Sequence, residues 1–380
     1  MKPIPGTAKL ITKDWLKNYL AFCLQNVQSF RDFCGQILPS YFCTIPKDRI
    51  QVRHWVQLIV FLLTLAIGLQ FFLYVRQATG NGPITIARPS GVEGFLPIGA
   101  LMGWKRFFTN AKWDEIHPAA MVIFGYAMVI SFMFHKAFCS WFCPVGTLSE
   151  WLWRFGNRYM GHNVILPKWL DYPLRLIKYL LLGFFVWVIF RLSASAISSF
   201  IQSPYYKISD VKMLRFFTHM TITTGTVLVV LAMGSVFIKN FWCRYFCPYG
   251  ALTGILGMLG PSKIRRNPET CINCSKCTEV CPHLLPVERK IAILSPECSA
   301  CMDCVESCPV KGTLIFSTGG KSLQKKWSTV SIGAVSITLF WCLFYLSSFS
   351  GIWESQLPEA EFRELLQVID SPLLTHPRVG

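Results

Sequence analysis

The sequence predicts an all-α polytopic membrane protein with about five transmembrane helices, into which one small cysteine-rich α+β domain is inserted. Three observations support this fold class. Hydrophobic residues make up 52% of the 380 residues. Charged residues make up only 15%, well below the roughly 25% of soluble domains. The chain also contains sixteen cysteines, most of which fall in metal-ligand spacings rather than in the pattern of a secreted disulfide scaffold.

Five hydrophobic runs are long enough to cross a bilayer, whose hydrocarbon core takes about 20 residues of helix. Four of them lack an internal charge, namely residues 55–75, 118–134, 220–238 and 327–353. The fifth, 173–192, contains Arg175, Lys178 and Arg191. Arg175 and Lys178 can extend to the interface from the inner end of this helix. Arg191 either marks the outer end, which we favour, or is a functional charge within the membrane.

Five spans place the two termini on opposite sides of the membrane, and the distribution of charge orients them. With the N-terminus in the cytoplasm, the inner segments hold 26 of the 37 Lys and Arg residues, as the positive-inside rule requires. The net charge of +17 therefore indicates contact with anionic lipid. We expect no nucleic-acid binding, because the sequence lacks a basic stripe interleaved with aromatics. The C-terminus is then expected in the periplasm.

Two copies of the spacing C-x2-C-x2-C-x3-C-P lie between residues 271 and 309. This is the spacing of bacterial ferredoxins with two [4Fe-4S] clusters, in which the fourth cysteine of each copy binds the other cluster. A zinc site does not need the third and fourth ligands at these offsets. We therefore predict one cluster on Cys271, Cys274, Cys277 and Cys308, and a second on Cys298, Cys301, Cys304 and Cys281.

These assignments divide the chain into five segments. An amphipathic cytoplasmic segment, 1–53, precedes a four-helix membrane domain, 54–262, and a cytoplasmic ferredoxin domain, 263–320. A fifth transmembrane helix is expected in 321–353, and a periplasmic tail, which we expect to be disordered, in 354–380. The remaining cysteines lack metal spacing and are interpreted as ordinary apolar residues; they are Cys23, Cys34, Cys43 and Cys342.

A second cysteine motif, C-x3-C-P-x-G, occurs twice, at the inner ends of the second and fourth predicted spans. KAFCSWFCPVG contains Cys139 and Cys143, and NFWCRYFCPYG contains Cys243 and Cys247. The repeat predicts an internally duplicated membrane domain whose equivalent sites face each other. On a helix, cysteines at i and i+4 share one face. Four such thiols suit a third iron-sulfur cluster or a single metal, or redox-active dithiols; packing cysteines are the alternative.

His117 and His219 lie at the outer starts of the same two spans, a little over twenty residues before the cysteines. With Arg191, they are candidate ligands of a quinol or of haem b, although a histidine at a helix start is more often an interfacial residue. We expect no c-type haem, because the sequence lacks a C-x-x-C-H motif. We also expect no flavin, because no attachment pattern is present.

The two C-x3-C-P motifs, the doubled ferredoxin motif and the segment RPSGVEGFLPIGALMGWK at 88–105 together resemble the membrane polyferredoxins NapH, CcoG and the C-terminal half of NosR. The resemblance implies electron transfer between the quinone pool and a respiratory or maturation partner, as in the membrane subunit of a quinol dehydrogenase. The CcoG branch implies instead a copper reductase, or an assembly factor for a metalloenzyme, that uses the C-x3-C-P thiols. That branch typically ends in a periplasmic domain for which this tail is too short, so we favour the NapH-like function.

Overall fold

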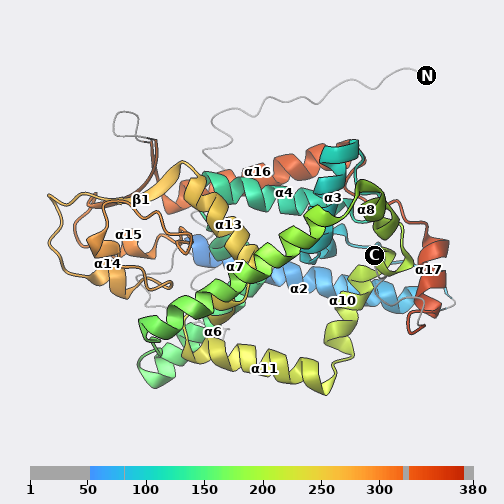
Figure 1. The fold of residues 1–380 in the computed structure, drawn as a ribbon, viewed down its shortest axis with the longest axis horizontal. Coiled ribbons are helices and arrows are strands. Elements are labelled where there is room, and N and C mark those ends of the chain that lie inside the picture. The colour runs from blue at the N-terminus through green and yellow to red at the C-terminus, as the bar shows by residue number, and fades with distance from the viewer. Residues whose placement is uncertain (1–51, 81, 320–324, 372–380) are drawn as a thin grey trace. The chain divides into compact units, whose positions relative to one another are not determined.

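A computed structural model describes residues 52–80, 82–319 and 325–371. The predicted N-terminal segment, 1–53, lies outside these residues except for its last two, which begin the first long helix. Cys23, Cys34 and Cys43 also lie outside them. Residues from 51 onward form a single unit, and Figure 1 shows its elements.

Three helices of the described ranges are long and apolar enough to cross a membrane. They are α2 (Val52–Ala78), α7 (Lys168–Arg191) and α16 (Thr329–Phe349), and each overlaps a predicted span. A fourth crossing is formed if α10 (Ser209–Thr218) and α11 (Ile222–Phe237), which meet at a bend of 79°, are taken together. Many apolar side chains of these helices are exposed, as expected where lipid rather than protein covers a helix.

The predicted span at 118–134 differs because its helix, α4 (Pro118–Met133), has only 16 residues. At 1.5 Å per residue such a helix is about 24 Å long, shorter than a hydrocarbon core of ~30 Å. α4 is also buried along most of its length by protein. The elements packed against it are η3 (Ser90–Phe95), α3 (Pro97–Asn110), α13 (Pro248–Leu259) and α16. In place of five similar spans, the described residues contain three long helices, one bent pair and a short central helix.

Short helices follow α4 and α11 in the same order. α5 (Ala137–Trp141) and α6 (Pro144–Met160) come after α4, and α12 (Phe241–Tyr245) and α13 come after α11. Both α6 and α13 begin at a proline, which suits the first helical position because its missing N–H has no partner there. Between α7 and α10, the chain forms α8 (Ala194–Ile201) and α9 (Pro204–Lys207).

The cysteine-rich segment is built on a three-stranded antiparallel sheet in the order β1-β2-β3. β1 (Ser262–Arg266) pairs with β2 (Leu314–Thr318), and β2 pairs with β3 (Lys325–Trp327). The chain between β1 and β2 carries α14 (Lys276–Glu279), η4 (Val287–Arg289) and α15 (Asp303–Glu306). Both ferredoxin-type motifs therefore lie in loops whose two ends are held side by side by the β1–β2 pair.

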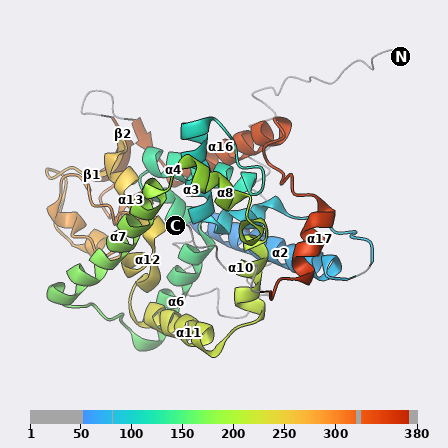
Figure 2. The same cartoon turned by 45° about the vertical axis from the view of Figure 1, so that its right-hand side comes forward.

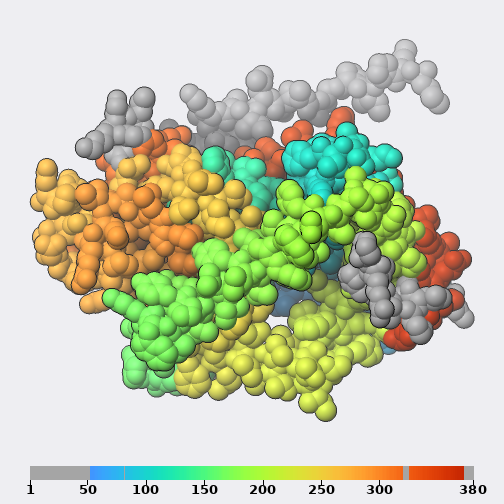
Figure 3. Space-filling model, viewed as in Figure 1, coloured from blue at the N-terminus to red at the C-terminus, as the bar shows by residue number. Residues whose placement is uncertain are grey.

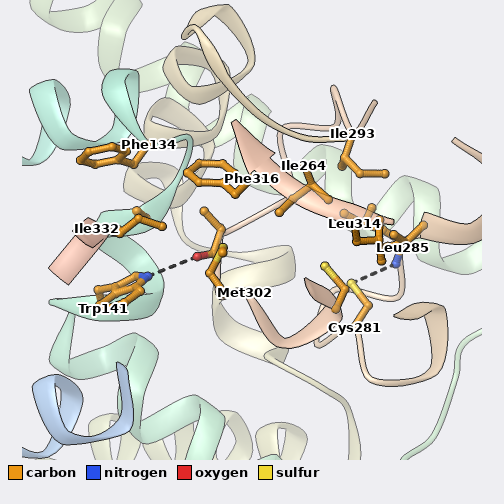
Figure 4. Close-up of a cluster of buried hydrophobic side chains, with 14 of the residues drawn as sticks. Phe134, Trp141, Ile264, Cys281, Leu285, Ile293, Met302, Leu314, Phe316 and Ile332 are labelled. Carbon is orange, nitrogen blue, oxygen red and sulfur yellow. Dashed lines mark hydrogen bonds between the residues drawn. The ribbon is translucent and has the colours of Figure 1, made fainter. Parts of the chain in front are cut away.

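This segment and the long helices share one hydrophobic core (Figure 4). Trp141 of α5 and Ile332 of α16 are fully buried in the same cluster as Ile264 of β1 and Phe316 of β2. Burying a large apolar side chain stabilises a fold by about 1.5–3 kcal/mol. The cysteine-rich segment is therefore fixed against the helices by packing. It occupies one end of the view in Figure 3.

The opposite end carries α17 (Glu359–Gln367), which lies beside the end of α2 (Figures 1 and 2). Phe362 is 1% exposed, and its ring centroid lies 5.4 Å from that of Tyr74 in α2. Lys207 pairs with Glu361 at 2.5 Å. The expectation of a disordered tail is therefore wrong for residues 354–371, because one face of α17 covers apolar side chains of α2.

Candidate metal centres

The eight ferredoxin-type cysteines line two separate cavities. One cavity, called the exposed site from here on, is lined by Cys271, Cys274, Cys277 and Cys308. The other, called the buried site, is lined by Cys281, Cys298, Cys301 and Cys304. Each cavity combines three thiols from one motif with the fourth cysteine of the other. This donor set suits a [4Fe-4S] cluster in each cavity.

The two sites differ in their access to solvent. Cys274 of the exposed site is exposed, whereas Cys301 and Cys304 of the buried site are buried. Ile272, beside the exposed site, is 63% exposed. Burial raises the pKa of Cys298 to about 12, so this thiol needs a bound metal to become a thiolate at neutral pH. Of the eight ligands of these two sites, Cys274 is the one that is exposed, and the others are half-buried or buried.

Both motif loops use the same uncommon backbone conformation. Asn273 and Ser275 have φ of 54° and 57°. Ala300 and Met302, at the equivalent positions of the second copy, have φ of 48° and 68°. Residues other than glycine rarely adopt positive φ, and each instance costs about 1–3 kcal/mol. The same strain at the same positions indicates that the loops are shaped to bring three thiols to one cavity.

The C-x3-C-P motifs do not lie on continuous helices, so the expectation that each pair shares one helix face is wrong. Cys139 lies in α5, but Cys143 is the N-cap of α6. Likewise, Cys243 lies in α12 and Cys247 is the N-cap of α13. The proline after the second cysteine starts a new helix in each copy, so the chain turns between the two thiols. The second thiol of each pair thereby sits at a helix N-terminus, where negative charge is favoured.

The structure brings the four C-x3-C-P cysteines, called the C-x3-C-P site from here on, close to one another. Cys139 Sγ lies 3.3 Å from the Thr253 hydroxyl of α13, which links the first motif to the second. Burial raises the pKa of Cys143 to about 12, and the neighbouring Cys139 and Cys247 add to the rise. Nowhere in the described residues do three His, Cys, Asp or Glu side chains have the spacing of a single-ion site.

The C-x3-C-P site adjoins the buried site through two hydrogen bonds from α5. Ser140 Oγ donates to the carbonyl of Ser299 at 2.6 Å, and Trp141 Nε1 donates to the carbonyl of Ala300 at 3.2 Å. Ser299 and Ala300 stand between the first two cysteines of the buried site in the sequence. Figure 4 shows Trp141 reaching this loop. The first C-x3-C-P motif and the buried site are therefore in direct contact.

Buried polar contacts strengthen the same junction. Arg53 of α2 donates to both carboxylate oxygens of Glu150 in α6, at 2.7 and 2.8 Å, and to Asp303 of the buried-site loop at 3.1 Å. Burial would raise the pKa of Glu150, but neighbouring arginines, chiefly Arg53, lower it well below its ordinary value. In the second motif, Arg244 donates to the carbonyl of His283 at 2.9 Å. Both copies of the C-x3-C-P motif thus hold the buried-site loops.

Lys136, the N-cap residue of α5, is a buried cation that no sequence motif singled out. It is 1% exposed, and its Nζ has no hydrogen-bond partner among the described residues. Lys178 is also buried rather than extended to the surface as expected, and it donates to both oxygens of Glu297 at 2.6 and 2.7 Å. The sequence does contain one indication that Lys136 is special. The equivalent position in the second copy of the motif is the uncharged Asn240.

The structure does not bring together the three other candidate ligands. His117 is fully buried at the start of α4, and its Nε2 lies 2.8 Å from the carbonyl of Tyr206. His219 is exposed at the end of α10. Arg191 is exposed as the last residue of α7, with its guanidinium 5.5 Å from the centre of the Trp187 ring. The two histidines therefore occupy different environments, unlike the repeated cysteines.

Family models of iron-sulfur proteins match three segments of the chain, which together contain both kinds of cysteine motif. A model described as a 4Fe-4S binding domain matches residues 116–161 and again residues 220–267. A model described as a 4Fe-4S dicluster domain matches residues 263–309. The first model therefore covers both C-x3-C-P motifs, and the second covers both ferredoxin-type motifs. No solved structure matches the chain.

Three related proteins carry names that describe them as electron transport or ferredoxin-type proteins. YccM of Escherichia coli K12, whose name assigns it provisionally to electron transport, is 42% identical over 328 residues, which cover 85% of this chain and 91% of that protein. The ferredoxin-type protein NapH of the same organism is 27% identical over 54% of this chain and 72% of its own length. The methylamine utilization ferredoxin-type protein MauN of Methylorubrum extorquens AM1 is 25% identical over 58% of this chain and 75% of its own length. The chain therefore belongs to the NapH-like family of ferredoxin-type electron transport proteins with 4Fe-4S domains.

Proposed function

We propose that this protein transfers electrons at the bacterial inner membrane between the quinone pool and a protein redox partner. Family membership supports the reaction class, and three long apolar helices support a place in the membrane. One observation carries the proposal. The first C-x3-C-P motif, which follows the apolar helix α4, is hydrogen-bonded directly to the loop of the buried site through Ser140 and Trp141.

We assign a [4Fe-4S] cluster to each of three cysteine sets. The exposed site and the buried site each offer four cysteines around one cavity. The C-x3-C-P site offers four more, in the region matched twice by a 4Fe-4S binding model. When bound, each cluster accepts and returns one electron. The protein's own residues hold the three sites in fixed positions and keep water from the inner two.

The three sites lie in series, and their surroundings suggest which end meets which partner. The C-x3-C-P site lies where α4 and α11 end, so we place the quinone at this membrane boundary. The buried site comes next, because Trp141 contacts its loop. The exposed site is last, and Cys274 is accessible there, so we place the protein partner at this end. An excess of Lys and Arg in the same segments supports a cytoplasmic position for the cysteine sites.

The number of clusters tests this assignment directly. Iron and acid-labile sulfide are measured per chain in anaerobically purified full-length protein, and we expect about twelve of each at four per cluster. A Cys143→Ser/Cys247→Ser variant should hold about eight, at the same four per cluster. Cys342→Ser, a control at an exposed cysteine of α16, should keep the full number. A wild-type protein with only the iron of two clusters contradicts the third assignment.

A further inference from the structure

The ammonium of Lys136 is buried without a counter-ion in hydrogen-bond contact. Its Nζ has no partner among the described side chains and carbonyls. Glu297 exerts the strongest attraction on it, but both oxygens of Glu297 already accept from Lys178, and Oε1 also accepts from the Tyr179 hydroxyl at 3.1 Å. An isolated buried charge is strongly unfavourable unless opposite charge lies close to it. The fold therefore requires negative charge near Lys136.

Thiols of the C-x3-C-P site lie around Lys136. A Cβ added to Gly250 would lie 3.5 Å from Lys136 Nζ and 3.6 Å from Cys247 Cβ, so the ammonium lies beside the start of α13. After Glu297, the groups that act on Lys136 are Cys139, Cys243 and Cys247. The ammonium therefore lies among thiols contributed by both copies of the motif.

The surrounding charges also leave an excess of cations. Arg175 and Arg244 both pair with Asp171, and Lys178 pairs with Glu297. With Lys136 included, four cations therefore lie near two carboxylates. The region lacks two negative charges if the thiols stay protonated.

Metal binding supplies this missing charge, because thiol ligands lose their protons when they bind a metal. Four cysteine ligands on a cluster give a centre with net negative charge. Protonated thiols or a disulfide pair would leave Lys136 to share the single charge of Glu297 with Lys178. The buried ammonium of Lys136 therefore favours a metal–thiolate centre at the C-x3-C-P site over protonated thiols or a disulfide.

We propose that Lys136 is the fixed counter-charge of an anionic iron-sulfur centre at the C-x3-C-P site and that it favours the reduced form of this centre. The proposal rests on the proposed function, in which these four cysteines hold a third cluster. One-electron reduction makes the centre more negative by one charge, and the electron comes from dithionite in vitro or from the quinol in the membrane. Because Lys136 already carries a proton, its charge stabilises the reduced centre without proton uptake. Charge near a cluster is one of the determinants of its reduction potential.

Two substitutions test the charge of Lys136 while keeping the length of the side chain. Lys136→Met removes the charge, and Lys136→Arg keeps it. Lys239→Met is the matched control, because Lys239 also lies just before a C-x3-C-P motif but is acted on by Cys281 rather than by the C-x3-C-P thiols. Each variant is purified anaerobically as the full chain. It is titrated with dithionite and followed by EPR, with iron counted per chain.

We expect the reduction potential of the third centre to fall in Lys136→Met and to stay near the wild-type value in Lys136→Arg and Lys239→Met. Selective loss of one cluster from Lys136→Met, with retention in Lys136→Arg, would support the same role. An unchanged potential in a Lys136→Met protein that keeps three clusters would overturn the counter-charge. A wild-type protein with two clusters would instead overturn the third centre itself, so the two failures are distinguishable by iron content.

Discussion

Trp141 Nε1 donates a hydrogen bond to the carbonyl of Ala300 over 3.2 Å, and this bond joins α5, the short helix that follows α4, to the loop of the buried site. Trp141 is fully buried, so the bond is shielded from water. The indole also packs in the core shared by α16 and the sheet. This side chain therefore helps to hold the two inner cysteine sites at a constant distance, together with Ser140 and Arg244.

Loss of this hydrogen bond should destabilise the contact between α5 and the buried-site loop. In Trp141→Phe, the Ala300 carbonyl loses its partner, and we expect a loss of stability of about 0.5–1.5 kcal/mol from the hydrogen bond, with a further loss from the smaller ring. The visible absorbance of the clusters during thermal unfolding reports this change. Trp341→Phe, at a half-exposed tryptophan of α16, is the control and should unfold like the wild type. Equal midpoints for the two variants would show that the Trp141 contact is not structural.

Arg53, which pairs with Glu150 of α6 and with Asp303 of the buried-site loop, should hold the cysteine-rich segment to α2 and α6. Arg53→Met leaves the buried Glu150 carboxylate without its main partner, a change that typically costs about 3–5 kcal/mol. We expect faster proteolysis and faster hydrogen exchange in the loops of the buried site. Arg76→Met, at an exposed arginine near the other end of the same helix, should leave both rates unchanged.

The same pair gives a pH dependence with a definite sign. The pKa of Glu150 is lowered in the folded protein, since Arg53 and its neighbours outweigh the effect of burial. Its contribution to stability is therefore present above the ordinary glutamate pKa and is lost as the pH falls below it. We expect the protection of the junction amides, which is the observed exchange rate corrected for the intrinsic pH dependence of exchange, to be constant from neutral to mildly acidic pH and to fall only in stronger acid. A loss of protection near neutral pH would show that another group controls the junction.

The two motif glycines should respond differently to alanine. A Cβ on Gly146 would lie 2.2 Å from the carbonyl oxygen of Cys139, whereas a Cβ on Gly250 meets no atom closer than 3.5 Å. Gly146→Ala must therefore displace the turn that carries Cys139 and Cys143, and we expect it to lose the iron of the third centre. Gly250→Ala should retain that iron. The iron content of the two purified proteins tests this prediction. Equal iron in both variants would show that the turn at Gly146 tolerates the added methyl group.

The exposed site should lose its cluster first under oxidation. Cys274 is exposed, while Cys301 and Cys304 are buried, so ferricyanide reaches the first set more easily. We expect about a third of the iron to be lost in a fast phase, as one cluster of three. EPR of the remaining signals identifies the surviving sites. Simultaneous loss of all signals would contradict the difference in exposure.

Local spacing predicted the two ferredoxin-type cysteine sets, because three ligands from one short loop are encoded by their offsets along the chain. The turn between Cys139 and Cys143 was also within reach, since Pro144 marks a helix start at least as well as a helix end. The length of α4 was not, because its burial depends on the elements that pack around it. The role of Lys136 could not be predicted either, because it depends on Cys243 and Cys247, which are more than a hundred residues away in the sequence.

The proposed route of the electrons runs between the quinone and the ferredoxin-type clusters through the C-x3-C-P site. Its most direct test is quinol-driven reduction in proteoliposomes, followed by freeze-quench EPR, in the wild type and in Cys143→Ser/Cys247→Ser. We expect dithionite to reduce the exposed and buried sites in both proteins, while quinol exchanges electrons with them only in the wild type. Exchange with quinol at the wild-type rate in the double variant would contradict the claim.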